Sequence, residues 1–310
     1  MKVLGCKWVF NIKEDSEGKK KHKARLVVGG HRQKEGIDFN ETFAPVVKHT
    51  SIRILLGLAT VLNWEVHQMD FVTAFLNGCI EENIYMKQPV GYEDGTERVC
   101  KLNKSLYGLK QAPRQWNIEL DSSMKRLGFQ RIQADHSVYK RRNLIVAVYV
   151  DDCILASKSL EEIEEFKLEV QKMYKVKDLG ELKIIVGMQW KRNRKEKTSI
   201  LYQEKYTSEI LERFGMTECK LASTPAVKPI TSTENFKDID LYQQAVGCLI
   251  YLNTCTRPDI SLAVSLVARK MSNPSMDDWR AVKRLLRYIK GTRNFGIRLG
   301  GNEKKIVWIC

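Results

Sequence analysis

Two adjacent aspartates stand between two apolar runs in the segment LIVAVYVDDCILAS, residues 144–157. A buried, unpaired carboxylate tends to take up a proton, and two neighbouring carboxylates repel each other. The pattern predicts strand, turn and strand, so that the turn carries Asp151 and Asp152 to one end of a sheet. A hard cation bound by carboxylate oxygens would offset the repulsion. The alternative is an ordinary solvated turn, because Asp is favoured in turns.

A third carboxylate ends another predicted strand. Asp70 closes the run of residues 64–70, inside the segment HQMDFVTAFLNG. Carboxylates on neighbouring strand ends can hold two Mg²⁺ ions roughly 3.5–4 Å apart, one activating an attacking oxygen and the other stabilising a leaving oxygen. The sequence therefore predicts a two-metal phosphoryl-transfer site built from Asp70, Asp151 and Asp152.

The composition favours a polyanionic partner. Lys and Arg number 52 against 37 Asp and Glu, a net charge of +15, which points to nucleic acid. A basic protein without such a partner is the alternative. The 8 cysteines contain no C-x-x-C pair, which argues against a zinc site. No apolar run approaches the roughly 20 residues of a membrane span, and the first residues lack a signal-peptide layout. We therefore expect no membrane partner and an intracellular location, and the sequence leaves open whether that location is cytoplasmic (particle-associated) or nuclear.

The predicted strands and helices alternate first and become mostly helical later. Residues 6–12 and 24–29 are predicted to form a hairpin with a basic tip, and residues 182–190 and 198–203 a second hairpin. The polar segment 225–238 is the best linker candidate. Helical spacing predicts helices that begin at Ser51, at Pro113 and after Ser159, and three more near 240–254, 258–272 and 277–290.

Two of these helices have recognisable ends. Gly128 is placed to end the helix that begins at Pro113. Ser159 and Glu162 are spaced as a capping box for the next helix. The buried stripe of that helix is predicted to run from Ile163 to Met173.

The sequence as a whole resembles that of the reverse transcriptases of copia-type LTR retrotransposons. Segments that follow the family pattern, in order, are CKWVFNIK, KARLVVGGHRQKEGIDFNETFAPVVKHTSIR, HQMDFVTAFLNG, LYGLKQAPRQW, YVDD, DLGELKIIVGMQW, GMTECKLASTP and YLNTCTRPDI. The resemblance covers almost the whole chain. It implies an α+β right-hand polymerase fold with fingers, a palm built on an antiparallel sheet, and a thumb, followed by a mostly helical connection region.

The same resemblance suggests domain limits. The implied parts are fingers and palm at 1–204, thumb segment and linker at 205–235, helical connection at 236–293, and the start of an RNase H-like domain at 294–310. The family normally carries a further segment upstream, and its first RNase H carboxylate would follow Cys310. We therefore expect no RNase H activity from this chain.

The implied activity is RNA-directed DNA polymerisation, in which a primer 3′-oxygen attacks the α-phosphate of a dNTP. The family's metal ligands carry over to Asp70, Asp151 and, more peripherally, Asp152, with the backbone carbonyl of Phe71 as a further ligand. The implied cofactors are two Mg²⁺ ions, which Mn²⁺ could replace. The implied partners are an RNA or DNA template–primer duplex and dNTPs, whereas the oligomeric state stays open.

Further site residues follow from the resemblance. Phe75 would lie under the incoming sugar and exclude a 2′-hydroxyl, and Tyr149 would pack near the primer end. The nucleotide contacts would be Lys23, Arg25, Gly108 and Lys110, and Gln111 would face the template. Spacing does not show which of Lys23 and Arg25 points inward. Each residue also has a plainer interpretation, as a core aromatic, a loop glycine or a solvated side chain.

Two other functions compete with the polymerase. The first is a truncated, inactive transposon remnant that binds nucleic acid without turnover. The second is a two-metal nuclease, which fits the acids but does not account for the segments LYGLKQAPRQW and MDFVTAF.

Overall fold

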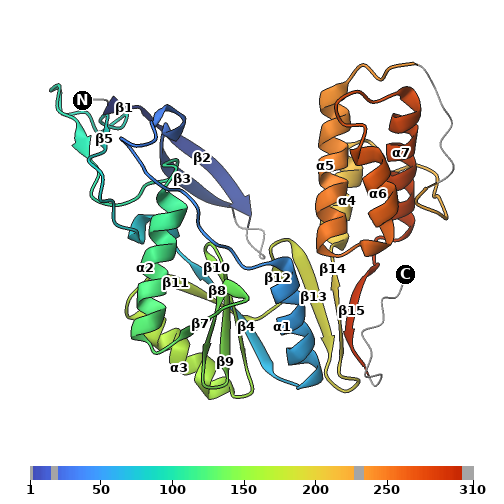
Figure 1. Cartoon of the computed structure of the whole chain (residues 1–310), viewed down its shortest axis with the longest axis horizontal. Coiled ribbons are helices and arrows are strands. Elements are labelled where there is room, and N and C mark those ends of the chain that lie inside the picture. The colour runs from blue at the N-terminus through green and yellow to red at the C-terminus, as the bar shows by residue number, and fades with distance from the viewer. Residues whose placement is uncertain (1–2, 15–19, 227–233, 302–310) are drawn as a thin grey trace. The chain divides into compact units, whose positions relative to one another are not determined.

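The computed structural model describes residues 3–14, 20–226 and 234–301. The chain divides into two compact units, and each unit combines two separate stretches of sequence (Figure 1). Unit 1 comprises Met1–Lys48 and His67–Gly180, and unit 2 comprises His49–Val66 and Glu181–Cys310. These limits differ from the predicted limits at 204, 235 and 293, because each predicted domain was one continuous stretch of sequence. Within the described ranges, no helix is long and apolar enough to cross a bilayer.

Unit 1 is built on a six-stranded sheet in the order β11-β4-β10-β9-β8-β7. The strands are β4 (Glu65–Phe71), β7 (Gln130–Ile132), β8 (Asp135–Arg141), β9 (Leu144–Tyr149), β10 (Asp152–Ser157) and β11 (Val176–Glu181). The pairs β7–β8, β8–β9 and β9–β10 are antiparallel. The predicted α+β class and the antiparallel palm sheet are therefore confirmed. The β9–β10 hairpin leaves only Val150 and Asp151 outside its strands.

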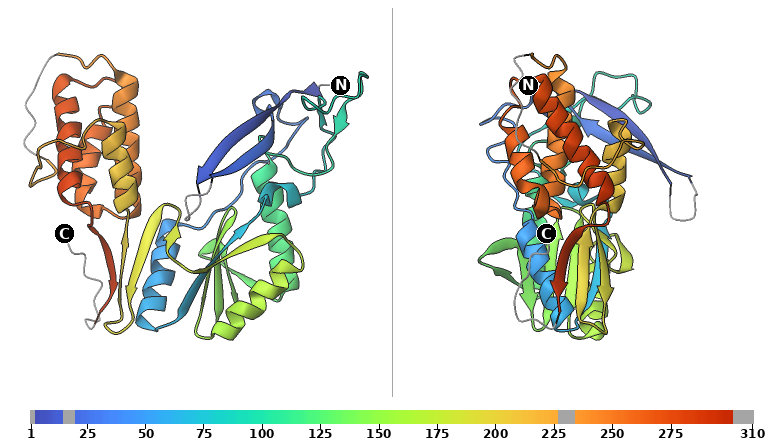
Figure 2. Two further views of the ribbon diagram at one scale, coloured as in Figure 1. Left: turned by 180° about the vertical axis from the view of Figure 1, so that it is seen from behind. Right: turned by 90° about the vertical axis from the view of Figure 1, so that its right-hand side faces the viewer.

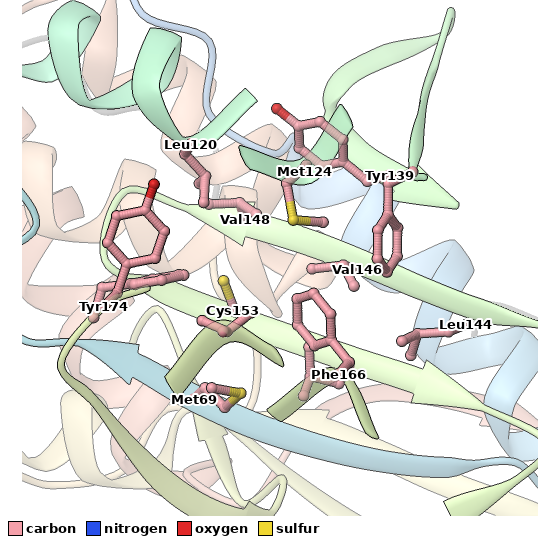
Figure 3. Packing of buried hydrophobic residues seen from close by; sticks show 14 of the residues in the cluster. Met69, Leu120, Met124, Tyr139, Leu144, Val146, Val148, Cys153, Phe166 and Tyr174 are labelled. Atoms are coloured by element: carbon pink, nitrogen blue, oxygen red, sulfur yellow. The ribbon is translucent and has the colours of Figure 1, made fainter. Parts of the chain in front are cut away.

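Two helices bury their apolar stripes on one face of this sheet. They are α2 (Ala112–Arg126) and α3 (Leu160–Gln171). Buried side chains recur at helical spacing on α2, at Trp116, Leu120 and Met124, and pack on strand residues such as Met69 and Cys153 (Figure 3). Each fully buried side chain of this size contributes roughly 1.5–3 kcal/mol. The face toward α2 and α3 is therefore the main core of unit 1.

The ends of these helices follow local chemistry. Gly128 adopts φ +80° just after α2, as its predicted place at the helix end requires. Ser159 caps α3 by accepting a hydrogen bond from the backbone N–H of Glu162. The predicted buried stripe was wrong at its end, because α3 stops at Gln171 and Met173 is 37% exposed.

A two-stranded hairpin and a small sheet complete unit 1. The hairpin pairs β2 (Cys6–Glu14) with β3 (Lys20–Val28), and both strands extend further toward the tip than predicted. The loop at 15–19 lies outside the described residues. The small sheet has the order β1-β5-β6, with strands β1 (Val3–Leu4), β5 (Tyr85–Met86) and β6 (Cys100–Lys101). Short 3-10 helices lie at η1 (Gly30–Arg32) and η2 (Ala74–Asn77).

Unit 2 begins with α1 (His49–Val61) and a four-stranded sheet, order β12-β13-β14-β15. The strands are β12 (Ile184–Ile185), β13 (Met188–Asn193), β14 (Thr198–Tyr202) and β15 (Gly296–Gly300). The predicted continuous strand 182–190 was wrong, because positive φ values at Val186 and Gly187 turn the chain between β12 and β13. β15, which was predicted to start an RNase H-like hairpin, pairs antiparallel with β14. Residues 302–310 lie outside the described part.

The rest of the described part of unit 2 is mostly helical (Figure 2). Its helices are α4 (Glu204–Arg213), α5 (Ile239–Cys255), α6 (Ser261–Ala268), which follows η3 (Pro258–Ile260), and α7 (Met276–Gly291). The three predicted late helices are confirmed. Their buried faces share one apolar cluster with Ile210 and Leu211 of α4. The predicted linker 225–238 falls partly on residues 227–233, which are outside the described residues.

A buried ion pair joins η3 to the end of α7. Arg257 is 1% exposed, and its guanidinium donates two hydrogen bonds to the carboxylate of Asp259, at 2.9 and 2.7 Å. It also donates to the carbonyl and hydroxyl oxygens of Thr292, and Tyr288 donates to Asp259 at 3.0 Å. Burial acts to raise the pKa of Asp259, but the bonds and charge of Arg257 outweigh it and lower that pKa.

This pair predicts a pH-dependent loss of stability in Asp259→Asn. Removing one partner of a buried pair costs about 3–5 kcal/mol of unfolding free energy. Because the folded-state pKa of Asp259 is lowered, its contribution is present above the unfolded-state pKa and is lost as pH falls through the folded-state pKa. Urea unfolding at pH 7 should show the full loss of unfolding free energy in the variant. Under acid conditions the difference in unfolding free energy between the variant and the native chain should become smaller. The matched Asp240→Asn, at an exposed position, should change little; equal effects of the two substitutions would contradict the prediction.

Candidate active site

The two predicted acidic segments meet at one end of the unit 1 sheet. β4 lies next to β10. The backbone N–H of Phe71 donates to the carbonyl oxygen of Asp151 at 2.8 Å. The residue directly after Asp70 is therefore hydrogen-bonded to the turn that carries Asp151, although 80 positions separate the two in sequence. The turn closes where Tyr149 pairs with Asp152.

The negative charges of all three acids act on the pKa of one buried thiol, that of Cys153. Cys153 is buried in the core behind the turn, and burial is the largest cause that raises the pKa of its thiol. The negative charges of Asp152, Asp151 and Asp70 raise it further, in that order. Each of the three acids is, or directly adjoins, a residue of the Phe71–Asp151 hydrogen bond, so this sheet end carries one acidic site.

Two neighbouring side chains interact with the acids. The Lys177 ammonium lies 4.0 Å from Oδ2 of Asp70, whose side chain is 30% exposed. Gln68 donates its amide N–H to Oδ1 of Asp152 at 3.2 Å. Asp151 is exposed. A cation and an amide donor therefore offset part of the carboxylate repulsion.

The donor chemistry fits a divalent metal ion. Carboxylate oxygens are the ligands that Mg²⁺ takes from proteins, and the three acids offer them at one sheet end. Among the described residues, however, no group of three or more His, Cys, Asp or Glu side chains is already placed around one point to hold a metal. The structure thus brings the predicted ligands together by element and leaves their coordination as a prediction.

Two predicted nucleotide contacts share one face of the β2–β3 hairpin. The register pairs Lys23 with Asn11 and Arg25 with Val9, so the two basic side chains project to the same side. The Arg25 guanidinium lies over the ring of Tyr107, 5.6 Å from its centroid. Lys23 is exposed. Of the two, Arg25 is thus the one placed by contact with the LYGLKQ segment.

Phe75 contacts the same tyrosine. It belongs to η2, is half-buried, and meets the ring of Tyr107 edge-on at 5.3 Å between centroids. Tyr107 therefore contacts both the predicted sugar-selecting ring and a predicted triphosphate contact. The sequence prediction missed Tyr107, although it stands in the quoted segment LYGLKQAPRQW.

Gly108 serves a close approach between two stretches of backbone. Its φ is +95°, and a Cβ built there would lie 2.1 Å from the carbonyl oxygen of Val28. Next to it, the N–H of Val28 donates to the carbonyl of Tyr107 at 2.8 Å. Glycine is thus required here by the contact with β3. Its predicted contact with nucleotide stays a prediction.

Gln111, the predicted template contact, is engaged within the protein, so its role at the template stays a prediction. This side chain is 0% exposed. Its Oε1 accepts from Gln33 at 2.9 Å, and its Nε2 donates to the carbonyl of Asp38 at 2.8 Å. Gln111 therefore ties the 33–38 loop to the start of α2. Lys110 is exposed over the ring of Phe39 at 4.8 Å, so its nucleotide role stays a prediction. The same holds for half-buried Tyr149, at the end of β9.

The chain matches the family described as "Reverse transcriptase (RNA-dependent DNA polymerase)" over residues 1–228. It is 46% identical to the retrovirus-related Pol polyprotein from transposon TNT 1-94 of Nicotiana tabacum, over 97% of this chain and 24% of that protein. It is 40% identical to the corresponding polyprotein from transposon RE1 of Arabidopsis thaliana, over 96% of this chain and 21% of that protein. The chain thus spans about a quarter or less of these curated relatives.

A shorter relative is covered over most of its length. The putative transposon Ty5-1 protein of Saccharomyces cerevisiae is 35% identical, over 78% of this chain and 82% of that protein. Among solved structures, the foamy viral protease-reverse transcriptase in complex with RNA/DNA hybrid has a TM-score of 0.44 at 12% identity. That match covers 94% of this chain and 34% of the viral chain, and it is too distant for a comparison of residues.

The contact at Gly108 predicts a steric effect of Gly108→Ala that a matched glycine lacks. Gly91 also has a positive φ, +85°, but a Cβ there would meet nothing within 4 Å. Gly91→Ala should therefore lose only the roughly 1–2 kcal/mol of left-handed strain. Gly108→Ala should lose about 1–3 kcal/mol more from overpacking against β3. Urea unfolding of the two variants measures the difference, and equal losses would show that the close approach to Val28 is unimportant.

Proposed function

This chain belongs to the reverse transcriptase (RNA-dependent DNA polymerase) family, and we propose that it acts as an RNA-directed DNA polymerase on a template–primer duplex. The observation that supports this proposal most directly is the hydrogen bond from the N–H of Phe71 to the carbonyl of Asp151. This bond brings the two acidic segments to one sheet end. In the reaction, the primer 3′-oxygen attacks the α-phosphate of a dNTP and pyrophosphate leaves.

The acids would hold two divalent ions in this reaction. Asp70 and Asp151, and more peripherally Asp152, would supply carboxylate oxygens, with the backbone carbonyl of Phe71 as a further ligand. When bound, such ions activate the attacking oxygen and stabilise the leaving oxygen. Lys177, 4.0 Å from Asp70, adds a positive charge beside this carboxylate.

The nucleotide would lie between the acids and the β2–β3 hairpin. Arg25 would donate to the triphosphate, for which the fork of guanidinium N–H groups is suited. Phe75 would lie under the sugar and leave no room for a 2′-hydroxyl. Tyr107 contacts both side chains, which supports placing their two ligand groups on the same molecule.

The partner would be bound chiefly through its phosphates. The chain carries a net charge of +15, and the hairpin face that holds Arg25 also holds Lys7, Lys21 and Lys23. Phosphate contacts position a duplex without reading its sequence. Binding should therefore weaken as salt rises, through counterion release.

Primer extension tests this function directly. Purified chain, primed poly(rA), dTTP and Mg²⁺ should give extension that rises with time. Asp151→Asn should lower the rate on the order of 10³-fold, since a lost metal ligand removes several kcal/mol of transition-state stabilisation and 1.36 kcal/mol is about tenfold. The exposed Asp240→Asn should leave it unchanged. Duplex binding without extension by any form would favour the nucleic-acid-binding remnant instead.

Sugar selection should depend on the ring at position 75. In Phe75→Val the smaller side chain makes room for a 2′-hydroxyl, so the ratio of kcat/KM for dTTP over UTP should fall about 10-fold or more. Single-nucleotide extension measures that ratio. Phe43→Val, a change of the same kind at a 70% exposed phenylalanine of unit 1, should leave it unchanged. An unaltered ratio in Phe75→Val would remove the sugar-selecting role of this residue.

A further inference from the structure

The two peptide planes that flank Asp151 are each held by one hydrogen bond from a different element. The indole Nε1–H of Trp116 on α2 donates to the carbonyl oxygen of Val150 at 2.7 Å. The backbone N–H of Phe71 on β4 donates to the carbonyl oxygen of Asp151 at 2.8 Å. Each peptide unit is planar, and the two planes meet at the Cα of Asp151. Together the two bonds set the direction of the Asp151 Cα–Cβ bond.

The turn needs such restraint because its first residue is strained. Val150 has φ +59°, in the left-handed region. A β-branched residue is a genuine outlier there, since its Cβ substituents crowd the backbone. A strained conformation of this kind persists only where the surroundings over-determine it. The hydrogen bond from Trp116 acts on the carbonyl of the strained residue itself.

The indole is itself fixed in place. Trp116 is buried, and its ring meets Phe71 edge-on at 5.0 Å and Tyr174 edge-on at 5.5 Å. The Tyr174 hydroxyl shares a hydrogen bond with Ser123 at 2.6 Å and donates to Glu119 at 2.8 Å, both on α2. The donor is therefore oriented by packing before any ligand arrives.

We infer that Trp116 is a positioning residue for Asp151: its indole N–H holds the strained turn so that the Asp151 carboxylate is presented beside Asp70. The catalytic consequence rests on the proposed polymerase function, whereas the restraint of the turn does not. A purely packing role would need only the aromatic ring. The positioning role needs the N–H, and this difference makes the two separable.

Four variants separate the N–H from the ring. Trp116→Phe keeps an aromatic side chain and removes the donor. Val150→Gly removes the strain, because glycine adopts positive φ readily, and the double variant Trp116→Phe/Val150→Gly combines the two. Trp190→Phe is the matched control, since the buried indole nitrogen of Trp190 has no hydrogen-bond partner among the residues that the structure describes.

The first measurement is primer extension on primed poly(rA). Trp116→Phe should lower kcat about 10- to 100-fold, because a misplacement of about 1 Å costs up to about 10²-fold. Its KM for dTTP and its Kd for the duplex should stay within about twofold. The kcat of the double variant should recover to within about threefold of that of the native chain. The kcat of the control Trp190→Phe should equal that of the native chain. Native kcat in Trp116→Phe, or no recovery in the double variant, would overturn the inference.

The second measurement needs no turnover. The Phe71 amide is protected by its bond to the Asp151 carbonyl, so a loosened turn should expose it. Hydrogen–deuterium exchange at this amide should be at least about 10-fold faster in Trp116→Phe, and slow again in the double variant. If the native chain extends no primer but exchange behaves this way, the polymerase proposal fails and the restraint stands. Unchanged exchange in Trp116→Phe overturns the restraint, whatever the activity.

Discussion

The pairing of β4 with β10 is the constraint on which the acidic site depends. It forces Asp70 and the turn at Asp151 to one sheet end, where their charges repel each other. Two like charges as close as about 4 Å would repel by about 1 kcal/mol in water and about 4 kcal/mol at an effective dielectric constant of 20. Each large side chain buried under α2 and α3 contributes roughly 1.5–3 kcal/mol. The apolar core is therefore large enough to hold the acids together.

The alternation of side chains along each strand separates the carboxylates from the apolar core. Met69 and Phe71 belong to the core cluster, so Gln68 and Asp70 project to the opposite face of the same strand. On β10, Cys153 enters the core and Asp152 accepts from Gln68. Asp70 and Asp152 thus lie on one face of the sheet, while the neighbouring residues Met69, Phe71 and Cys153 are buried in the core on the other face.

The sequence predicted what periodicity and local chemistry encode. The amphipathic spacing of α2, its end at Gly128 and the Ser159 cap are local signals, and all were found. The sequence shows less where tertiary contacts decide. Gln111 looks like a surface polar residue in a motif, yet it is buried and its side-chain amide is hydrogen-bonded to the 33–38 loop. The partners Lys177 and Trp116 were missed because spacing shows which side is buried, not which donor meets which acceptor.

The ring of Tyr107 connects two parts of unit 1. Arg25 comes from β3 and Phe75 from η2, and neither position constrains the other along the chain. Tyr107 touches both, while its backbone carbonyl accepts from Val28 of the same strand that carries Arg25. A guanidinium can stack on a ring and keep its N–H edge available, which an ammonium cannot do equally well. The spacing between Arg25 and Phe75, the two proposed nucleotide contacts, is therefore set by their packing on Tyr107.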